Sequence, residues 1–513
     1  MGSGHVAVVG AGLGGLVAAL LLARQGLAVT VVERAARAGG KLRQVAIGEA
    51  RIDAGPTVLT MRGVFDEIFA QAGASFASHV TLQPLDVLAR HAWGADQRLD
   101  LFADIERSVD AIGRFAGPAE GRRYRSFCDR ARRSFDVLDN SFIRAARPSV
   151  GGLLQKVGLR GVGPLWRAGP FSTLWSALGE HFHDERLRQL FGRYATYSGA
   201  SPFAAPATLM VIAHVERSGV WRVEGGPYRI AQAIELLAAS LGVSFRYGTE
   251  AREVIVKGGR ATGLRLACGE QMDADAVILN ADAAAIACGR LGQAISGTVA
   301  PQPASRRSLS AVTWAMVAKT DGFPLLHHSV FFSGNYRAEF DDIFRRGRLP
   351  AEPTVYVCAQ DRADHDATPT LGQERLLCLV NAPPTGDNHP LAQSEIDACE
   401  ERTFHLLRRA GLNVHCRREA TVRTTPTDFD RLFPATGGAL YGQAQHGWTA
   451  SFSRPGARTA LPGLYLTGGS IHPGPGLPMV ALSGQQAAAS LLADLASTAR
   501  SSLVGMPGGV SPR

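Results

Sequence analysis

The chain has 513 residues, of which 46% are hydrophobic and 19% are charged, and it carries 58 glycines and a formal net charge of +9. Disordered chains are poor in apolar residues, so this composition excludes them, and the glycines lack the three-residue period of collagen. At about 100–200 residues per domain the length predicts two or three domains, and the basic charge leaves nucleic acid, a membrane surface or no special partner open.

The N-terminal stretch Val6–Ala23 is 18 residues long and has no charged residue. Its length alone would allow a transmembrane helix or a signal peptide. However, no Lys or Arg precedes it, and the four glycines inside it disfavour a membrane helix. A strand at Val6–Val9, a helix at Leu16–Gln25 and a second strand at Val29–Val32 account for the glycines. We therefore expect neither a signal peptide nor a transmembrane helix here.

The turn between the first strand and the helix carries a dinucleotide-binding fingerprint. It reads Gly10-Ala11-Gly12-Leu13-Gly14-Gly15, and Glu33 closes the second strand 23 residues after Gly10. In such a fingerprint the glycines permit a tight turn, close approach to a pyrophosphate and packing of helix on strand. The N–H groups of the helix N-terminus attract the phosphates. Glu33 would accept hydrogen bonds from an unphosphorylated adenosine ribose, so the pattern predicts a bound dinucleotide.

Two short motifs after Glu33 narrow the choice of dinucleotide. They are Gly39-Gly40-Lys41 and Asp53-Ala54-Gly55-Pro56-Thr57. With the fingerprint, they resemble the signature of the flavin-dependent amine oxidase and carotenoid desaturase superfamily: GxGxxG, Glu, GG[RK], D-x-G-P. The resemblance implies that Gly40 and Lys41 lie over the phosphates of FAD, and that Gly55, Pro56 and Thr57 lie near the flavin. Lys41 stands where Arg is commoner, so a point charge replaces a bidentate contact.

The middle of the chain adds strands that the resemblance assigns to the same FAD-binding domain. A helix is expected at Ile230–Leu241, a strand at Val243–Phe245, a hairpin over Val254–Leu266 and a buried strand at Ala276–Leu279. In relatives, the backbone near the position of Val254 contacts the adenine end of FAD.

A second glycine-rich loop lies near the C-terminus. A strand at Leu464–Thr467 leads into the loop Gly468–Pro478, and a helix is expected over Met479–Ala496. The N-terminus of that helix would stabilise negative charge on a reduced flavin. The predicted cofactor contacts here are Gly468, Gly469, Pro478, Met479 and Val480. The pattern H-P-G-x-G-x-P over His472–Pro478 resembles the bacterial carotenoid (phytoene desaturase-like) desaturases, although many of those have Gly where this chain has Met479.

Two internal segments narrow the resemblance further. Residues 188–197 (RQLFGRYATY) and 219–226 (GVWRVEGG) resemble the 1-hydroxycarotenoid 3,4-desaturase branch, also called methoxyneurosporene or hydroxyneurosporene dehydrogenases. The family implies an α/β fold: a Rossmann-like FAD-binding domain with an inserted α+β substrate domain. Monoamine oxidase relatives attach flavin through a C-terminal Cys, and none follows Cys416 here, so FAD is expected to bind non-covalently.

The expected domain boundaries follow from this resemblance. The FAD-binding domain takes residues 1–85, 216–289 and 451–498, a substrate and membrane-contact region takes 86–215, a substrate domain takes 290–450, and a disordered tail takes 499–513.

Cysteine and histidine usage predicts a reducing compartment and no metal. The seven cysteines are odd in number, widely spaced and never arranged as CxxC, which argues against a disulfide framework or a zinc site. His181 and His183 form a His-x-His pair, but no suitably spaced carboxylate accompanies them. We therefore expect a surface or core role for this pair.

The resemblance implies desaturation, at C-3,4, of an acyclic 1-hydroxycarotenoid such as 1-hydroxyneurosporene. A hydride passes to the flavin and the neighbouring carbon loses a proton. Because the polyene delocalises the charge, the protein mainly has to align the bond and exclude water. Arg193, Tyr194 and His472 are candidates for positioning or proton transfer; the alternative roles are an ion pair, core packing and a hydrogen-bonded loop histidine, respectively. The electron acceptor is expected to be oxygen or a quinone, with NAD(P) also open.

Other functions stay open at this point. Within the superfamily they are desaturation of phytoene or another carotene, carotenoid isomerisation, retinol saturation and amine oxidation. GDP-dissociation inhibitors use the same fold without FAD to bind lipid-modified proteins. The presence of Glu33, Gly39–Lys41 and Gly468–Pro478 argues against such a flavin-free lipid-binding protein.

The segment Ser141–Gly179 predicts contact with a membrane surface. It contains no acid, and its five cations are Arg144, Arg147, Lys156, Arg160 and Arg167, mixed with Phe142, Trp166, Phe171 and Trp175. A carotenoid is nearly insoluble in water, so we expect peripheral, monotopic attachment on the cytoplasmic side of a membrane. The alternative is a solvated basic face over the substrate domain. No nucleic-acid-binding module is evident, so no nucleic acid partner is expected.

Overall fold

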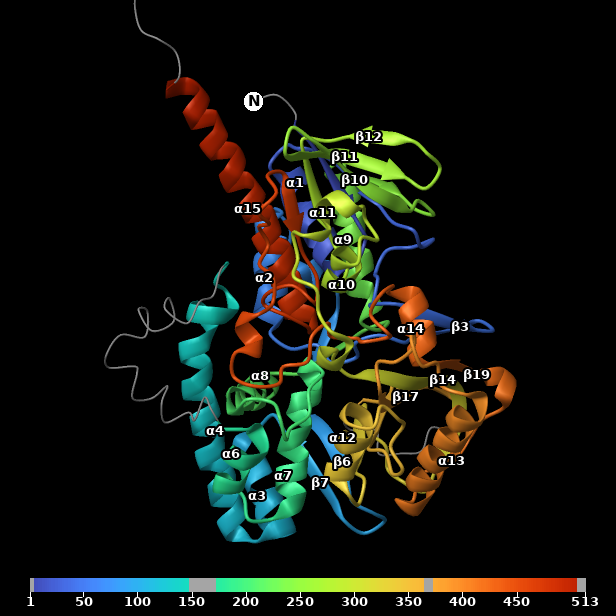
Figure 1. Ribbon diagram of the computed structural model, residues 1–513. Coiled ribbons are helices and arrows are strands. Elements are labelled where there is room, and N and C mark those ends of the chain that lie inside the picture. The colour runs from blue at the N-terminus through green and yellow to red at the C-terminus, as the bar shows by residue number, and fades with distance from the viewer. Residues whose placement is uncertain (1–3, 147–171, 364–371, 505–513) are drawn as a thin grey trace, which may run out of the picture.

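The computed structural model describes residues 4–146, 172–363 and 372–504, which form two layered parts. Figure 1 shows one part above the other: a parallel-sheet part that contains both described ends of the chain, and a mixed-sheet part below it.

The parallel-sheet part is organised around a five-stranded sheet in the order β20-β13-β1-β2-β9. All neighbouring pairs are parallel. Its central strands consist mostly of Val, Ile, Leu and Ala and are buried on both faces, as expected for a parallel sheet covered on two sides. The strands are β1 (His5–Val9), β2 (Ala28–Val32), β9 (Ser244–Arg246), β13 (Ala276–Leu279) and β20 (Leu464–Leu466). The sheet therefore combines strands from the beginning, the middle and the end of the chain.

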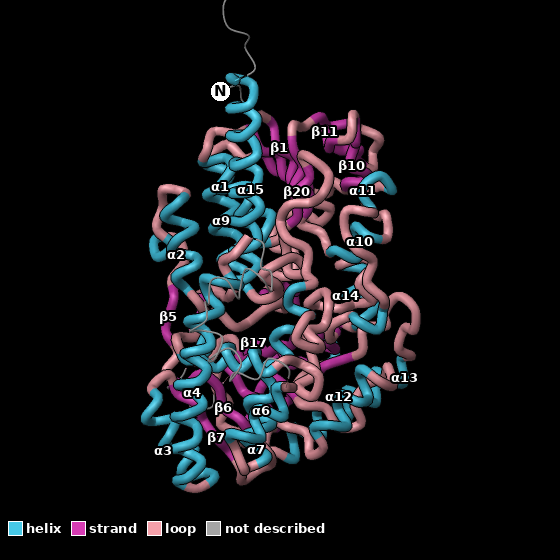
Figure 2. Tube along the Cα trace, turned by 60° about the vertical axis from the view of Figure 1, so that its left-hand side comes forward, coloured by secondary structure: helices cyan, strands magenta, loops and turns pink. Residues whose placement is uncertain are grey.

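Helices cover one face of this sheet and a small antiparallel sheet covers the other. Helices α1 (Leu13–Arg24), α9 (Tyr228–Ser240) and α15 (Leu477–Val504) lie side by side (Figure 2). On the opposite face, Val254 and Leu264 share a buried cluster with Val277. The small sheet consists of β10 (Ala251–Lys257), β11 (Arg260–Leu266) and β12 (Gln271–Asp273), and two short helices follow, α10 (Ala283–Ala287) and α11 (Gln293–Ser296).

The expected strands and the hairpin of this part are confirmed, with small shifts of their ends. Helix α1 begins at Leu13 rather than at Leu16, because the Leu16 N–H already donates to Gly12 O at 2.9 Å. Helix α15 continues to Val504. The expectation of a disordered tail over 499–513 is therefore wrong for 499–504, and residues 505–513 lie outside the described residues.

The mixed-sheet part is organised around an eight-stranded sheet. Seven strands follow the order β18-β14-β17-β16-β15-β6-β7, and β19 also pairs with β14. The strands are β6 (Val87–Ala92), β7 (Arg98–Phe102), β14 (Ser310–Asp321), β15 (His328–Phe331), β16 (Val355–Ala359), β17 (Glu374–Ala382), β18 (Asn413–His415) and β19 (Thr421–Thr424). Strands β6 and β7 come from the region 86–215 and the others from 290–450, so both regions contribute to one sheet.

Helices surround this sheet (Figures 1 and 2). They are α3 (Ile105–Ala116), α4 (Pro118–Leu138), α6 (Leu174–His181), α7 (Glu185–Gly192), α8 (Val211–Arg217), α12 (Tyr336–Phe344), α13 (Gln393–Arg409) and α14 (Pro426–Leu432). Phe127, Phe182 and Phe191 pack together in the core between these helices, with ring centroids 4.9–5.3 Å apart. Among the described residues, no helix is both long enough and apolar enough to cross a bilayer.

Short paired strands and a helix join the two parts. They are the hairpin β3 (Gln44–Ile47) with β4 (Ala50–Asp53), helix α2 (Arg62–Gln71), and the pair β5 (Leu82–Pro84) with β8 (Trp221–Val223). Ile52 packs against Cys358 and Leu377 of the mixed sheet. The Asp53 carboxylate accepts a hydrogen bond from the Tyr228 N–H at 2.9 Å, which ties the junction to α9.

Candidate active site

The dinucleotide fingerprint forms the turn between β1 and α1, and its glycines are required by space. Gly10 has φ +95°, and its N–H donates to Val32 O at 2.8 Å. A Cβ on Gly15 would lie 2.2 Å from Gly10 O, and one on Gly14 would lie 2.5 Å from Thr467 Oγ1. Leu13, Gly14 and Gly15 form the first turn of α1. The loop therefore folds as the fingerprint predicts.

Glu33 is bound directly to this loop. One carboxylate oxygen accepts a hydrogen bond from the Ala11 N–H at 2.7 Å, and the other accepts one from the Ala35 N–H at 2.8 Å. A carboxylate oxygen has more than one acceptor position, so both oxygens could still bind ribose hydroxyls. The contacts orient Glu33, which the sequence pattern alone did not indicate.

The start of α1 packs closely on α15. A Cβ on Gly484 would lie only 2.4 Å from Gly14 O. Neither helix has an acidic residue in its first turn. The free N–H groups and positive dipole ends of the two helices are therefore available to an anion.

The backbone of the second glycine loop, just before α15, is held mainly by hydrogen bonds to side chains. Gly468 has φ +126°, and its N–H donates to Ser483 Oγ at 3.2 Å, while Gly469 O accepts from Arg454 Nη1 at 3.0 Å. In the first turns of α15, the Val480 N–H donates to Gly476 O at 2.9 Å. These contacts fix the backbone at all the predicted positions here except Pro478 and Met479, which line the cavity described below.

The motif Gly39-Gly40-Lys41 packs directly on the fingerprint. The Gly39 N–H donates to Ala11 O at 2.8 Å, and Gly40 has φ +59°. Lys41 is partly buried and donates to Leu440 O at 2.6 Å, and loss of solvation lowers its pKa. A Cβ on Gly55 would lie 1.9 Å from Lys41 O, so Gly55 has to be glycine. The motifs Gly39-Gly40-Lys41 and Asp53–Thr57, which are separate in the sequence, thus lie against each other and form one wall of the site.

This wall borders a cavity of about 410 Å³ that extends from the parallel-sheet part into the mixed-sheet part. Lys41, Gly55, Pro56, Thr57, Pro478 and Met479 line the first end. The remainder is largely apolar and includes Leu209, Ile212, Val330, Leu377 and Leu379. Such a mixture of apolar walls and few polar groups is typical of small-molecule sites.

One buried polar cluster lines this cavity. Glu216 accepts hydrogen bonds from Tyr194 Oη at 2.5 Å and Tyr197 Oη at 2.9 Å, and Arg193 Nη2 lies 3.9 Å from it. Burial by itself lowers the pKa of Arg193, but the neighbouring Tyr197 hydroxyl and Glu216 carboxylate outweigh burial and raise the pKa overall. Arg193 Nε has no hydrogen-bond partner among the described residues. Arg193, Tyr197 and Glu216 line the cavity.

The other two candidates from the sequence lie behind the cavity wall. Neither Tyr194 nor His472 is among the described lining residues. Tyr194 is fully buried among aromatic rings and supports Glu216. His472 Nε2 lies 3.0 Å from Phe142 O, and burial lowers the pKa of this histidine to about 4. Phe142 does line the cavity, so His472 acts on the cavity through a neighbour.

Val254 is buried in β10, and its N–H donates to Leu291 O at 2.9 Å. Its backbone donor is therefore already used, and any contact with a cofactor falls to its carbonyl oxygen.

The sequence did not single out the mixed-sheet residues that line the cavity opposite the glycine motifs. Tyr356 on β16 bonds to Thr57 Oγ1 at 2.7 Å and to His328 Nδ1 on β15 at 2.7 Å. Tyr356 follows the inward alternation of a strand, but no spacing distinguishes it from a core tyrosine. Only the register of β15 and β16 brings these side chains together.

Most of the basic segment Ser141–Gly179 falls on 147–171, outside the described residues, including Arg147, Lys156, Arg160, Trp166, Arg167 and Phe171. In the part that is described, Arg144 pairs with Glu67 at 2.8 Å and with Asp139 at 3.3 Å. Phe142 packs on His472, and Trp175 packs on Phe203. The described members of the segment are therefore engaged within the protein.

The site has the features that a flavin dinucleotide requires. The glycine loops leave backbone N–H groups near two helix starts, and the partly buried Lys41 and the buried Arg454 lie close to the same loops. Burial lowers the pKa of Arg454 to about 10, and its Nε has no partner among the described residues. A buried cation with an unused donor suits an anionic ligand.

Comparison with known proteins identifies the family. The profile of an NAD(P)-binding Rossmann-like domain matches residues 8–71, and that of the flavin-containing amine oxidoreductases matches residues 172–492. The chain is 54% identical to a hydroxyneurosporene desaturase of Rubrivivax gelatinosus over 510 residues, which is 99% of this chain and 97% of that protein. It is 44% identical to the hydroxyneurosporene desaturase of Cereibacter sphaeroides (96% and 99% coverage). It is 33% identical to an all-trans-zeta-carotene desaturase of Myxococcus xanthus (94% and 92%).

Solved structures agree on the fold. Putrescine oxidase with putrescine bound superposes with a TM-score of 0.58 at 16% identity, covering 96% of this chain and 99% of that one. An oxidoreductase from Methanosarcina mazei gives a TM-score of 0.57 at 18% identity (94% and 99%). These likenesses confirm the predicted α/β class, a Rossmann-like domain with an inserted second region. The chain belongs to the flavin-containing amine oxidoreductase family, and within it to the carotenoid desaturases.

Proposed function

We propose that this protein is a FAD-dependent desaturase that introduces a C=C bond, at C-3,4, into an acyclic 1-hydroxycarotenoid such as 1-hydroxyneurosporene. The observation that carries the proposal is the cavity of about 410 Å³, in which Lys41, Gly55–Thr57 and the start of α15 face a largely apolar wall that carries the cluster Arg193, Tyr197 and Glu216. The 54% identity to a hydroxyneurosporene desaturase over nearly the full length supports this choice of substrate.

FAD, when bound non-covalently, supplies the hydride acceptor of the reaction. Lys41 and the start of α15 stabilise negative charge at the cofactor end of the cavity, because both present positive potential there. The apolar lining holds the polyene and excludes water. The protein therefore contributes mainly by positioning the substrate and by providing a water-free, positively polarised environment for the cofactor.

The cluster of Arg193, Tyr197 and Glu216 binds the hydroxyl group of the substrate. In a 1-hydroxycarotenoid the hydroxyl carbon is only two carbons from C-3, so the group that recognises it has to lie close to the reacting bond. Charged groups are expensive to bury without a partner, and a substrate hydroxyl can accept from Arg193 Nε. A carotene that lacks the hydroxyl leaves this donor unsatisfied, which gives a basis for discrimination.

Turnover in liposomes tests this function. The FAD-loaded protein is incubated separately with 1-hydroxyneurosporene and with phytoene, and the products are separated by chromatography. We expect a product with one more conjugated double bond from the hydroxylated substrate. Conversion of phytoene alone would overturn the substrate assignment in favour of a carotene desaturase. A protein purified without flavin absorbance would instead favour a flavin-free lipid-binding protein, and release of FAD by acid precipitation tests non-covalent binding.

The proposal includes peripheral attachment on the cytoplasmic side of a membrane, and oxygen or a quinone as electron acceptor. Support comes from the insolubility of the substrate and from the cations Arg147, Lys156, Arg160 and Arg167 of Ser141–Gly179, whereas Arg144 is paired with Glu67 and Asp139. Replacing all five cations with Gln is expected to reduce co-sedimentation with anionic liposomes. The matched control replaces Arg252, Arg265 and Lys257 on the small sheet. Equal co-sedimentation of both variants and the unmodified protein would reject this segment as the membrane contact.

A further inference from the structure

A chain of hydrogen bonds leads away from the cavity through the mixed sheet. Thr57 Oγ1 and Tyr356 Oη, both at the cavity wall, lie 2.7 Å apart, and Tyr356 Oη lies 2.7 Å from His328 Nδ1. His328 is 4% exposed, and its Nε2 has no hydrogen-bond partner among the described residues. This series of hydrogen bonds thus starts at the cavity and reaches His328 Nε2, a buried ring nitrogen whose hydrogen-bonding capacity is unused among the described residues.

His327 continues the chain on the other side. Its ring centroid lies 4.6 Å from that of His328, and its Nδ1 lies 3.1 Å from Ala359 O and 3.2 Å from Arg362 O. Because carbonyl oxygens only accept, Nδ1 carries the proton and Nε2 carries the lone pair. One ring nitrogen of His327, one of His328 and Cys358 Sγ lie within 4.8 Å of one another, and His327 Nε2 lies 4.0 Å from Cys358 Sγ.

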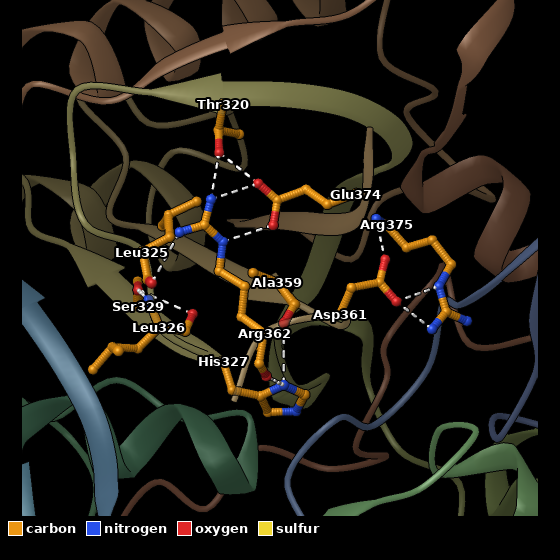
Figure 3. A network of polar contacts seen from close by, with 10 residues as sticks. All are labelled: Thr320, Leu325, Leu326, His327, Ser329, Ala359, Asp361, Arg362, Glu374 and Arg375. Atoms are coloured by element: carbon orange, nitrogen blue, oxygen red, sulfur yellow. Dashed lines mark hydrogen bonds and ion pairs between the residues drawn. The ribbon is translucent and has the colours of Figure 1, made fainter. Parts of the chain in front are cut away.

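His327 lines a second, polar cavity of about 130 Å³, together with Asp53, Arg222, Glu224, Asp361 and Arg375. Figure 3 shows His327 below the ion pairs Arg362–Glu374 and Asp361–Arg375. The side chains of Asp361 and Arg375 are 33% and 30% exposed, so this cavity adjoins the surface. Tyr356, His328 and His327 therefore lie one beside the next between the apolar cavity and this polar cavity.

We propose that Tyr356, His328 and His327 carry the proton that the substrate loses from the apolar cavity to the polar one. This inference depends on the proposed desaturation. One C–H bond breaks with both electrons passing to the flavin as hydride, and the neighbouring C–H bond breaks so that its electron pair becomes the new double bond. The proton goes to Tyr356 Oη while the tyrosine proton moves to His328 Nδ1. His328 then releases its Nε2 proton to His327 Nε2, which passes it to solvent in the second cavity.

The protonation states suit this role. Burial raises the pKa of Tyr356 well above its usual value, so it stays a phenol with a proton to give. Burial also lowers the pKa of His327 to about 4 and that of His328 well below its usual value. Both histidines are neutral at neutral pH, and a neutral imidazole has one nitrogen to accept and one to donate. A proton that enters the chain is not retained.

The test compares Tyr356→Phe and His328→Gln with Tyr465→Phe, a buried tyrosine of the parallel-sheet part whose hydroxyl donates to Asp494 at 2.8 Å. In single turnover of the FAD-loaded protein on 1-hydroxyneurosporene, we expect the first two variants to form product about 100–10,000-fold more slowly, as for loss of proton transfer. The unmodified protein should also slow in D₂O, and Tyr356→Phe should show a smaller D₂O effect. Rates in both variants equal to that of Tyr465→Phe would overturn the proposal.

A second measurement needs no turnover. In protein labelled with ¹⁵N-histidine, Tyr356→Phe should shift the His328 Nδ1 resonance, because its hydrogen bond is lost, whereas Tyr465→Phe should not. An unshifted resonance would show that Tyr356 and His328 are not hydrogen-bonded and would overturn the proposal. One equivalent of a bound metal that disappears in His327→Gln would also overturn it, because metal-bound imidazoles cannot pass the proton on. If the shift occurs but the unmodified protein forms no product from 1-hydroxyneurosporene, both the proposed function and this use of the chain are refuted.

Discussion

The two ends of the cavity are built from different kinds of groups, main chain at one end and buried side chains at the other. At the parallel-sheet end, glycine-containing motifs shape the wall: Gly55 lines the cavity directly, and Gly40 immediately precedes the lining residue Lys41. At the mixed-sheet end, buried side chains such as Glu216 and Tyr356 supply the polar groups. A backbone-built site is rigid and depends on the absence of side chains, whereas a side-chain-built site depends on pairing each buried polar atom. Substitutions at the two ends should therefore affect stability and cofactor binding in different ways.

The largest effect is expected at the side-chain end. Arg193→Met leaves Glu216 buried without its cation, and breaking a buried pair costs about 3–5 kcal/mol of unfolding free energy. FAD binding should persist, because the glycine loops are untouched. The matched control is Arg265→Met, which breaks the exposed pair with Glu253 and should cost less than about 1 kcal/mol. Urea titration measures both, and equal losses would contradict the distinction between the two ends.

At the backbone end, Gly15→Ala places a Cβ 2.2 Å from Gly10 O. Overpacking of this kind costs about 1–3 kcal/mol, and the displaced turn should also lose FAD. Gly63→Ala in α2 is the control, since its Cβ would meet nothing within 4 Å. Flavin absorbance per protein and the urea midpoint report the two effects. Full flavin content in Gly15→Ala would show that the loop tolerates a side chain.

The pH dependence of stability should report on His327, which lines the polar cavity behind the mixed-sheet end. The folded pKa of His327, about 4, lies below its ordinary value of 6.5, so between these values the unfolded chain binds more protons. The stability contributed by the neutral, buried ring is complete above pH 6.5 and is lost as pH falls to about 4. His327→Gln should reduce the slope of unfolding free energy against pH by about one proton, or about 1.4 kcal/mol per pH unit. If urea titrations between pH 4 and 6.5 gave the same slope for both proteins, the lowered pKa of His327 would be contradicted.

The smallest effect is expected at the boundary between the ends. His472→Ala removes the hydrogen bond to Phe142 O and should cost about 0.5–1.5 kcal/mol. FAD should stay bound, and turnover should slow because Phe142 loses its support in the cavity wall. Normal product formation would remove His472 from any role in the site.

The difference between a main-chain end and a side-chain end also explains which parts of the site could be predicted from the sequence. The glycine motifs have fixed spacing because each glycine meets a particular neighbour, so Gly10–Gly15, Gly39–Lys41 and Gly468–Pro478 were recognisable without coordinates. The strands of the parallel sheet were predictable because they are short runs of Val, Ile and Ala. Tyr356 and His328 were not, because their meeting depends on strand register. For His472 and Tyr194, neighbouring motifs suggested direct roles, but both lie behind the wall.

The parallel sheet also has a consequence for biosynthesis. Its edge strand β20 and the helix α15 are made last, yet they complete the wall that begins with β1 and α1. A ribosome adds about 5–20 residues per second, so the first glycine loop waits some tens of seconds for its partners. A cofactor pocket that includes both glycine loops is therefore complete only after α15 has been made, and truncation before β20 should yield a chain that does not retain the cofactor.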